Sequence, residues 1–164
     1  FGALGVLASS QGTVNNTVYG NDKYQNYETI CGGTGAGPGH AGTSAVHSHM
    51  TNTRLTDPEI LEWRFPLRVE SFSIRPNSGG QGAYPGGDGI VRELTFLEPM
   101  TLTLLGSHRL TDPYGLAGGG SGARGHDFIR RASGRVDELG GTDEAELGVG
   151  DTFVQETPGG GAYG

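Results

Sequence analysis

Glycine is the residue that most constrains this chain, because it supplies 32 of the 164 residues, nearly three times the usual share of ~7%. A glycine loses more conformational freedom on folding than any other residue. The glycines have no three-residue period, which excludes a collagen helix. They alternate with stretches that contain Tyr, Ile and Val, so the pattern is that of a folded domain with a thin core and not of a flexible linker.

The segments between the glycine clusters predict mostly strands. Alternating apolar and polar residues over 67–74 indicate a half-buried strand. Asp57 is a suitable N-cap for a short helix over 57–64, Pro58 suits its first position, and Pro66 ends it. The remaining predicted elements are a loop over 32–42, strands over 45–50, 90–96 and 100–105, a hairpin over 127–136 turning at Ser133-Gly134, and a hairpin over 143–156 turning at 148–151.

These elements predict one mainly β domain, since no 15-residue amphipathic helix is present. We expect a β-sandwich or open barrel with long glycine-rich loops and one short helix. An α+β arrangement is the alternative.

Charge and cysteine content exclude several classes of function. The net charge is −7 and Lys23 is the single lysine, so the sequence shows no basic patch and nucleic-acid binding is not expected. No apolar stretch approaches the ~18 residues of a membrane span. Cys31 is the single cysteine, which excludes a disulfide framework and favours a cytoplasmic protein.

One polar run stands out near the middle of the chain. Residues 47–59 carry two histidines, an amide, a guanidinium, two carboxylates and four hydroxyls. Burying such groups without partners costs ~1–3 kcal/mol each. The run is therefore either solvated or directed at a ligand.

The same run is where the chain resembles the hydantoinase B/5-oxoprolinase family. The stretch from His47 through Glu62 matches a family hallmark, and its HSHMTNTR form is most like the 5-oxoprolinase members. Further matching blocks are SQGTVNN at 10–16, YETICGGTGA at 27–36, SGGQG at 78–82, GGDG at 86–89, PYGL at 113–116 and ETPGGGAYG at 156–164.

The resemblance implies a role in a larger enzyme. The matched blocks correspond to the C-terminal end of longer family members, so we expect residues 1–164 to be one C-terminal segment, a fragment of a larger chain. The implied reaction is the ATP-dependent opening of 5-oxo-L-proline, or a related hydantoin, to the amino acid. Phosphorylating the lactam oxygen creates a leaving group that water can displace.

The resemblance also implies the cofactors and partners. ATP and magnesium would bind the missing part of the enzyme, and a divalent metal could bind upstream, so we expect none of them to be bound by this chain alone. The partners would be the A-type and N-terminal B-type regions in an oligomer, with the small cyclic amide as substrate. Two alternatives stay open, a non-catalytic structural or assembly module of that enzyme and a part of a related ATP-dependent ketone carboxylase.

His47 and His49 are candidate catalytic residues. On a strand they would point to one face, where they could contact substrate or handle protons. Asp57 or Glu59 could complete a metal site with them. Surface or interface histidines are the alternative, and Glu59 is also a candidate catalytic carboxylate.

Asn52 and Arg54 are the better candidates for contacts to substrate. An arginine fork binds a carboxylate in two places, and 5-oxoproline carries one. An asparagine amide can donate to a lactam oxygen and accept from its N–H. The alternative is loop scaffolding, with Asn52 bonded to the local backbone and Arg54 paired with Glu59 or Glu62.

The glycine loops and Cys31 give weaker signals. Residues 37–42 and 120–125 both fit G-x-G-x-x-G, but neither follows a convincing strand and opens a helix, so a dinucleotide site is not expected. We expect these glycines to have positive φ or to let backbone groups approach a partner. Gly86–Gly89 is expected to form a turn in which Asp88 bonds the backbone. Cys31 is interpreted as a small residue beside a glycine turn and not as a nucleophile.

Overall fold

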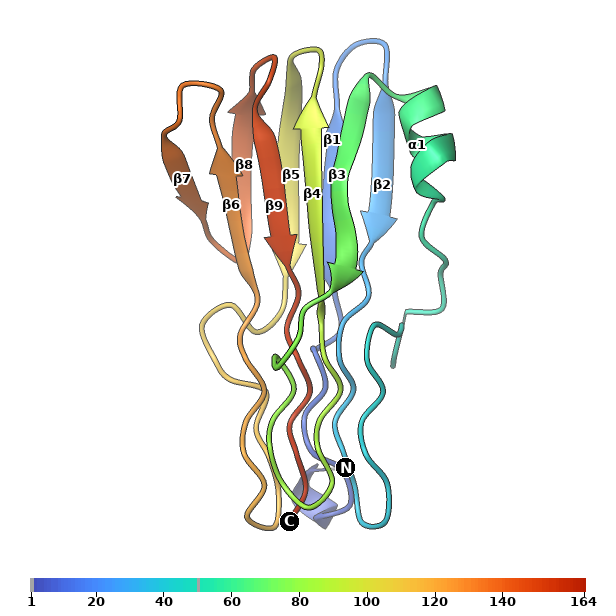
Figure 1. Cartoon of the computed structure of the whole chain (residues 1–164), viewed down its shortest axis with the longest axis vertical. Coiled ribbons are helices and arrows are strands. Elements are labelled where there is room, and N and C mark those ends of the chain that lie inside the picture. Colours follow the sequence, from blue (N-terminus) through green and yellow to red (C-terminus); the bar gives the residue numbers. More distant parts are fainter. Residues whose placement is uncertain (1, 50) are drawn as a thin grey trace.

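The computed structural model describes residues 2–49 and 51–164, which fold into two antiparallel sheets packed face to face (Figure 1). The first sheet has the order β2-β1-β5-β8 and the second β3-β4-β9-β6-β7. The elements are a 3-10 turn at Gly2–Leu4, β1 (Asn15–Gly20), β2 (Gln25–Thr29), α1 (Pro58–Arg64), β3 (Leu67–Ile74), β4 (Ile90–Phe96), β5 (Met100–Gly106), β6 (His126–Arg130), β7 (Val136–Leu139), β8 (Thr142–Leu147) and β9 (Thr152–Glu156).

This open β-sandwich with one short helix confirms the predicted fold class. The predicted ranges of β3 and β4 match the structure. The predicted turn at Ser133-Gly134 joins β6 and β7, and Gly134 has φ +87°, but β7 runs to Leu139, beyond the predicted range 127–136. The helix α1 is capped as expected, because Asp57 accepts a hydrogen bond of 2.9 Å from the Glu59 N–H. The helix ends at Arg64, two residues before Pro66.

The predicted hairpin over 143–156 is wrong, although its turn is present. Asp151 closes the turn by accepting a 2.8 Å hydrogen bond from the Gly148 N–H. The strands on either side enter different sheets: β8 pairs with β5, whereas β9 lies between β4 and β6. The turn therefore connects the two layers of the sandwich, which local sequence does not reveal.

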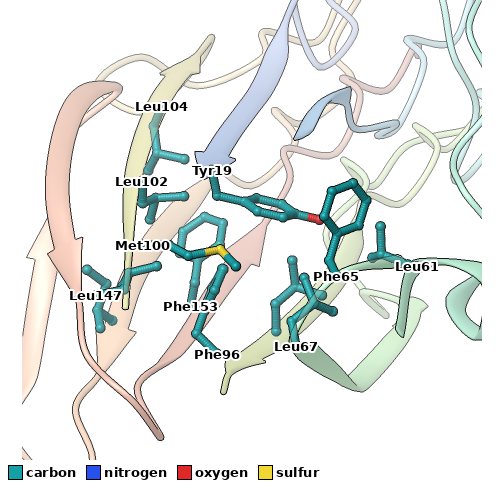
Figure 2. Close-up of a cluster of buried hydrophobic side chains, with 12 residues drawn as sticks. Tyr19, Leu61, Phe65, Leu67, Phe96, Met100, Leu102, Leu104, Leu147 and Phe153 are labelled. Carbon is teal, nitrogen blue, oxygen red and sulfur yellow. The ribbon is translucent and has the colours of Figure 1, made fainter. Parts of the chain in front are cut away.

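The hydrophobic core lies between the two sheets. Figure 2 shows Leu102 and Leu104 of β5 beside Phe153 of β9, with the ring of Tyr19 reaching Phe65. The Tyr19 ring meets those of Phe65 and Phe96 edge to face, at centroid distances of 6.1 and 5.4 Å. Leu61 of α1 is fully buried in the same cluster. The short helix thereby covers the side of the sandwich near β2 and β3.

The other half of the molecule is built from glycine-rich segments that run alongside one another without forming strands (Figure 1). Their backbones touch directly. A Cβ atom on Gly33 would lie 1.9 Å from the Gly87 oxygen, and one on Gly160 would lie 1.9 Å from the Thr34 oxygen. Real Cβ atoms do not approach so closely, so these positions require glycine for space and not for positive φ. We call this half the glycine bundle, comprising residues 31–46, 78–89, 113–125 and 157–164.

Residues 160–162 lie at the centre of the glycine bundle. Gly160 donates to the Gly87 oxygen and accepts from the Gly80 N–H, both at 2.8 Å. Gly161 donates to Ser9 and accepts from the Ala36 N–H, and Ala162 donates to Gly120. One short segment thus joins four others by backbone hydrogen bonds, which satisfy its buried polar groups. In the described residues, no helix is long and apolar enough to cross a membrane.

Candidate functional site

Residues 47–49 and 51–57 of the polar run form an irregular loop and not the strand predicted over 45–50, and Pro58 and Glu59 begin α1. Val46 alone forms an isolated bridge, with Gly32, and Met50 lies outside the described residues. His49 has φ +58°, in the left-handed region that interrupts a strand. The argument that His47 and His49 share one strand face is therefore wrong.

The His47 ring packs against neighbouring parts of the chain and has no hydrogen-bond partner among the described residues. Both of its ring nitrogens are buried without a partner among the described residues, as is the Ser48 hydroxyl. Burial lowers the pKa of His47 below its usual value of 6.5, so the ring is neutral at pH 7.

His49 lines a pocket of about 350 Å³. Its Nε2 lies 2.5 Å from the Ser10 hydroxyl oxygen. Ser10 is only 5% exposed, and its hydroxyl also accepts a hydrogen bond of 3.3 Å from the Gly12 N–H. The other polar lining residues are Ser9, Thr13, Ser107 and Tyr114. We call this the serine pocket.

Asn52 lies on a second pocket of about 300 Å³, which shares Thr13 with the serine pocket. Asn16, Tyr27 and Thr51 also line it. The Asn52 side chain is exposed and makes no hydrogen bond to another described residue. The scaffolding alternative expects Asn52 to bond to the local backbone, and no such hydrogen bond is present among the described residues.

Arg54 is exposed and forms no ion pair within the described residues. The alternative partner Glu62 instead accepts a 2.7 Å hydrogen bond from the Val69 N–H. Glu59 is exposed in the first turn of α1. The structure thus brings His49 and Asn52 to adjoining pockets, whereas Arg54 and Glu59 line neither pocket.

A buried ion pair holds the end of the polar run, and no local sequence pattern predicts it. Glu28 on β2 and Arg92 on β4 approach to 2.7 Å, and each side chain is at most 6% exposed. The other carboxylate oxygen of Glu28 accepts a 2.9 Å hydrogen bond from the Thr56 N–H. Burial opposes ionisation of Glu28, but Arg92 and the Thr56 N–H outweigh it and hold the pKa below its usual value.

A second buried polar network lies next to the serine pocket. The Arg109 guanidinium binds both oxygens of Asp127, at 2.9 and 3.1 Å, and donates to the Asn15 amide oxygen at 2.6 Å. Asn15 in turn donates to the side chain of Gln11. The SQGTVNN block therefore supplies Ser10, Gly12 and Thr13 to the serine pocket, and Gln11 and Asn15 to this buried network. Sequence reasoning missed Ser10, because its partner His49 lies 39 residues away.

The weaker signals have structural explanations. Glycines of both G-x-G-x-x-G matches pack in the bundle, where Gly42 meets Thr34 and Gly122 meets Gly160, whereas Gly39 has φ +87° and open space beside it. Asp88 bonds the backbone as predicted, accepting from the Gly79 N–H at 2.7 Å, but its segment is extended and not a turn. Cys31 is buried, and burial raises the pKa of its thiol. The described residues contain no cluster of three potential metal ligands.

The comparisons with known proteins agree with the sequence blocks and the fold. A model of the hydantoinase B/oxoprolinase family matches residues 1–164. This chain belongs to that family. It is 44% identical to the 5-oxoprolinase of Dictyostelium discoideum and 46% identical to 5-oxoprolinase 1 of Arabidopsis thaliana, each over 99% of the chain.

The relatives are much longer than this chain. The matched region covers 13% of each of the two 5-oxoprolinases, so the chain corresponds to a segment of a larger enzyme. Among solved structures, the ATP-dependent caprolactamase of Pseudomonas jessenii matches 97% of this chain and 30% of its own, with a TM-score of 0.78. At 23% identity this likeness shows that the two chains share a fold.

Proposed function

We propose that this chain is part of an ATP-dependent amidohydrolase resembling 5-oxoprolinase, in which the polar run and its two pockets form a wall of the hydrolytic site. The enzyme opens 5-oxo-L-proline, or a related hydantoin, to the amino acid. The identity of 44–46% to proteins named 5-oxoprolinase supports this reaction.

One observation carries the site assignment. The polar run is attached to the protein near both ends, by the Ser10–His49 contact and by the bond from Thr56 to Glu28. Between these attachments Asn52 and Arg54 are exposed and have no side-chain partners among the described residues. A loop that is fixed at both ends and leaves its polar groups free is suited to receive a polar ligand.

The chemistry of 5-oxoproline fits these groups. Arg54 binds the substrate carboxylate through two parallel N–H donors, and Asn52 matches the lactam by donating to its oxygen and accepting from its N–H. His47, His49 and Glu59 remain candidates for proton handling at the same wall. In the reaction, water adds to the carbonyl carbon and the ring nitrogen leaves as an amine.

ATP and magnesium belong, in this proposal, to the A-type and N-terminal B-type regions of an oligomeric enzyme. The described residues offer no cluster of metal ligands, so no step at this wall is assigned to a metal. The single cysteine favours a cytoplasmic enzyme.

Replacing Arg54 with Ala in the complete enzyme tests the site assignment. We expect kcat/KM for 5-oxoproline to fall by about 2–4 kcal/mol of transition-state stabilisation, because the carboxylate loses a charged, bidentate partner. Thermal stability should change by less than ~0.5 kcal/mol, since the residue is exposed. Arg135→Ala is the matched control, because its side chain is 70% exposed on the β6–β7 hairpin. Steady-state kinetics and melting curves on the same preparations provide the measurement.

A role in assembly is the second candidate, and the surface of α1 favours it. Trp63 is 84% exposed and Ile60 is 48% exposed, three positions apart on the helix. Tryptophan is enriched at the energetic centres of protein interfaces. In a pure assembly module, Arg54→Ala would leave the kinetics of the surviving enzyme intact. Normal kcat/KM together with a lowered melting temperature would reject the active-site assignment.

A further inference from the structure

The serine pocket is assembled from segments that are far apart in the sequence. Its wall is formed by residues 7–10, Gly12, Thr13, His49, Ser107 and Tyr114. Its polar groups are hydroxyls and an imidazole, and no Asp, Glu, Lys or Arg lies among these lining residues. Such a lining suits an uncharged group that both donates and accepts hydrogen bonds, such as the ring amide of a lactam.

Hydrogen bonding orients the Ser10 hydroxyl towards His49. The Gly12 N–H donates to the Ser10 oxygen at 3.3 Å, so that oxygen already has a donor. The hydroxyl proton is then free to point at the His49 Nε2, 2.5 Å away. The two atoms lie within the distance of one hydrogen bond, along which a proton can pass.

The backbone of His49 supports a special role for its ring. A non-glycine residue at φ +58° is uncommon, and such strain persists where the surrounding structure imposes it, often at functional sites. Here the left-handed conformation belongs to the residue whose imidazole reaches the buried serine hydroxyl.

A neighbouring serine–histidine pair provides a contrast. His108 also has a positive φ, of +54°, and its Nε2 lies 3.3 Å from the Ser9 hydroxyl. Its Nδ1 lies 3.1 Å from the Thr111 carbonyl oxygen. The Thr111 hydroxyl also lies 3.3 Å from this Nδ1, so both ring nitrogens of His108 have partners in the protein. No such second bond to a described residue occupies the Nδ1 of His49.

We propose that Ser10 and His49 form a proton relay and that the serine pocket holds the cyclic amide, an assignment that rests on the proposed function. Water adds to the carbonyl carbon and passes a proton to the Ser10 oxygen, while the serine's own proton moves to the His49 Nε2. The ring C–N bond then breaks, and the proton returns through Ser10 to the leaving nitrogen. One water is consumed, its oxygen on carbon and one of its protons on nitrogen, and both side chains regain their starting states.

The test uses the complete enzyme and three variants. Ser10→Ala removes the hydroxyl, and Ser10→Thr retains it. His49→Asn removes the imidazole but keeps a residue that tolerates the left-handed conformation. The matched control is Ser133→Ala, an exposed serine in the β6–β7 turn. Initial rates are measured with 5-oxoproline, hydantoin and ε-caprolactam, and each preparation is also melted.

We expect kcat to fall about 100-fold or more in His49→Asn and about 10- to 100-fold in Ser10→Ala, with smaller changes in KM. Ser10→Thr should recover most of the rate. Because the two residues act as one unit, the double variant should be no slower than the slower single variant. Purely structural damage would instead lower the melting temperature, and the hydroxyl of Ser10→Thr would not restore the rate.

The outcomes separate this inference from the proposed function. If the wild-type enzyme opens only hydantoin or caprolactam, and the variants lose that turnover, oxoproline is rejected as the substrate and the relay is supported. Wild-type turnover of oxoproline with unchanged kcat in folded Ser10→Ala and His49→Asn would overturn the relay and leave the proposed function standing. A wild-type enzyme that opens none of the three amides would overturn both.

Discussion

Glu28 joins three parts of the molecule through one carboxylate. It accepts from Arg92 in the opposite sheet and from the Thr56 backbone at the end of the polar run. It also lies 3.4 Å from the Asn26 amide nitrogen, which donates to the Tyr19 hydroxyl. A buried charge with this many partners is costly to disturb, because removing one member leaves the other charge buried without compensation.

Replacing Glu28 with Gln should therefore destabilise the fold by about 3 kcal/mol, because Arg92 loses its counter-charge while remaining buried. For a chain of this size the melting temperature should fall by roughly 6–12 °C. Glu144→Gln, an exposed position on β8, should change it little. Calorimetry at pH 7 measures both, and an unchanged melting temperature in Glu28→Gln would contradict the importance of the pair.

The same residue gives a pH dependence with a definite sign. The folded pKa of Glu28 lies below its ordinary value of 4.5, so its contribution is present above about pH 4.5 and is lost as the pH falls through the folded pKa. Wild-type stability should thus decline in acid more steeply than that of Glu28→Gln. Denaturant unfolding at pH 7 and below pH 4.5 checks the difference, and parallel declines in the two proteins would refute it.

At the scale of elements, the glycine bundle replaces side-chain packing with backbone contact. Its segments approach so closely that a methyl group has no room, as at Gly160 beside the Thr34 oxygen. The blocking atoms belong to the main chain, which cannot rotate away as a flexible side chain can. The cost of adding a methyl group should therefore be high.

Gly160→Ala should destabilise the protein by about 3 kcal/mol, at the upper end of the usual cost of overpacking. Gly140→Ala is the matched control, because the nearest atoms there lie 3.7 Å from the added Cβ. Its free energy of unfolding should stay within ~0.5 kcal/mol of wild type. Urea unfolding compares the two, and equal stabilities would show that the bundle can yield.

Elements defined by local patterns were predictable, whereas partners across the chain were not. The strand β3 follows from its alternation and α1 from its Asp57–Pro58 start, because both signals lie within a few residues. The turn at 148–151 was predicted, but which sheet β9 joins depends on β4 and β6. The hairpin of β1 and β2 was not predicted at all.

The candidate site was predictable in composition but not in geometry. Residues 47–59 were singled out by their polar content, but the left-handed backbone of His49 has no sequence signature. Its contact with Ser10 and the anchoring of Thr56 by Glu28 join residues 39 and 28 positions apart. No periodicity relates such positions, so the sequence alone does not reveal them.

At the scale of the whole molecule, two kinds of packing meet end to end (Figure 1). The sandwich half contains the aromatic and leucine core, whereas the bundle half relies on backbone hydrogen bonds. Strand β9 continues directly into the centre of the bundle at residues 157–162. The two halves therefore share a continuous backbone at their most buried point.

The 164-residue chain by itself should release no glutamate from 5-oxoproline with ATP, because it corresponds to 13% of the related 5-oxoprolinases. Its thermal transition should be weak or broad, since its core is thin. An enzymatic assay and calorimetry on the purified chain test the two statements. ATP-dependent glutamate release, or a sharp transition above about 70 °C, beyond the ~45–65 °C typical of mesophile domains, would contradict them.

The central position of residues 157–162 also has a consequence for synthesis. Every segment that they touch in the bundle precedes them along the chain, so the ribosome delivers those segments first and the one that joins them afterwards. Until it emerges, the earlier glycine-rich segments have exposed backbone groups and no common partner. The bundle can therefore close only after residues 157–162 have been made, and a nonsense codon shortly before residue 157 would leave the earlier segments of the bundle without the segment that joins them.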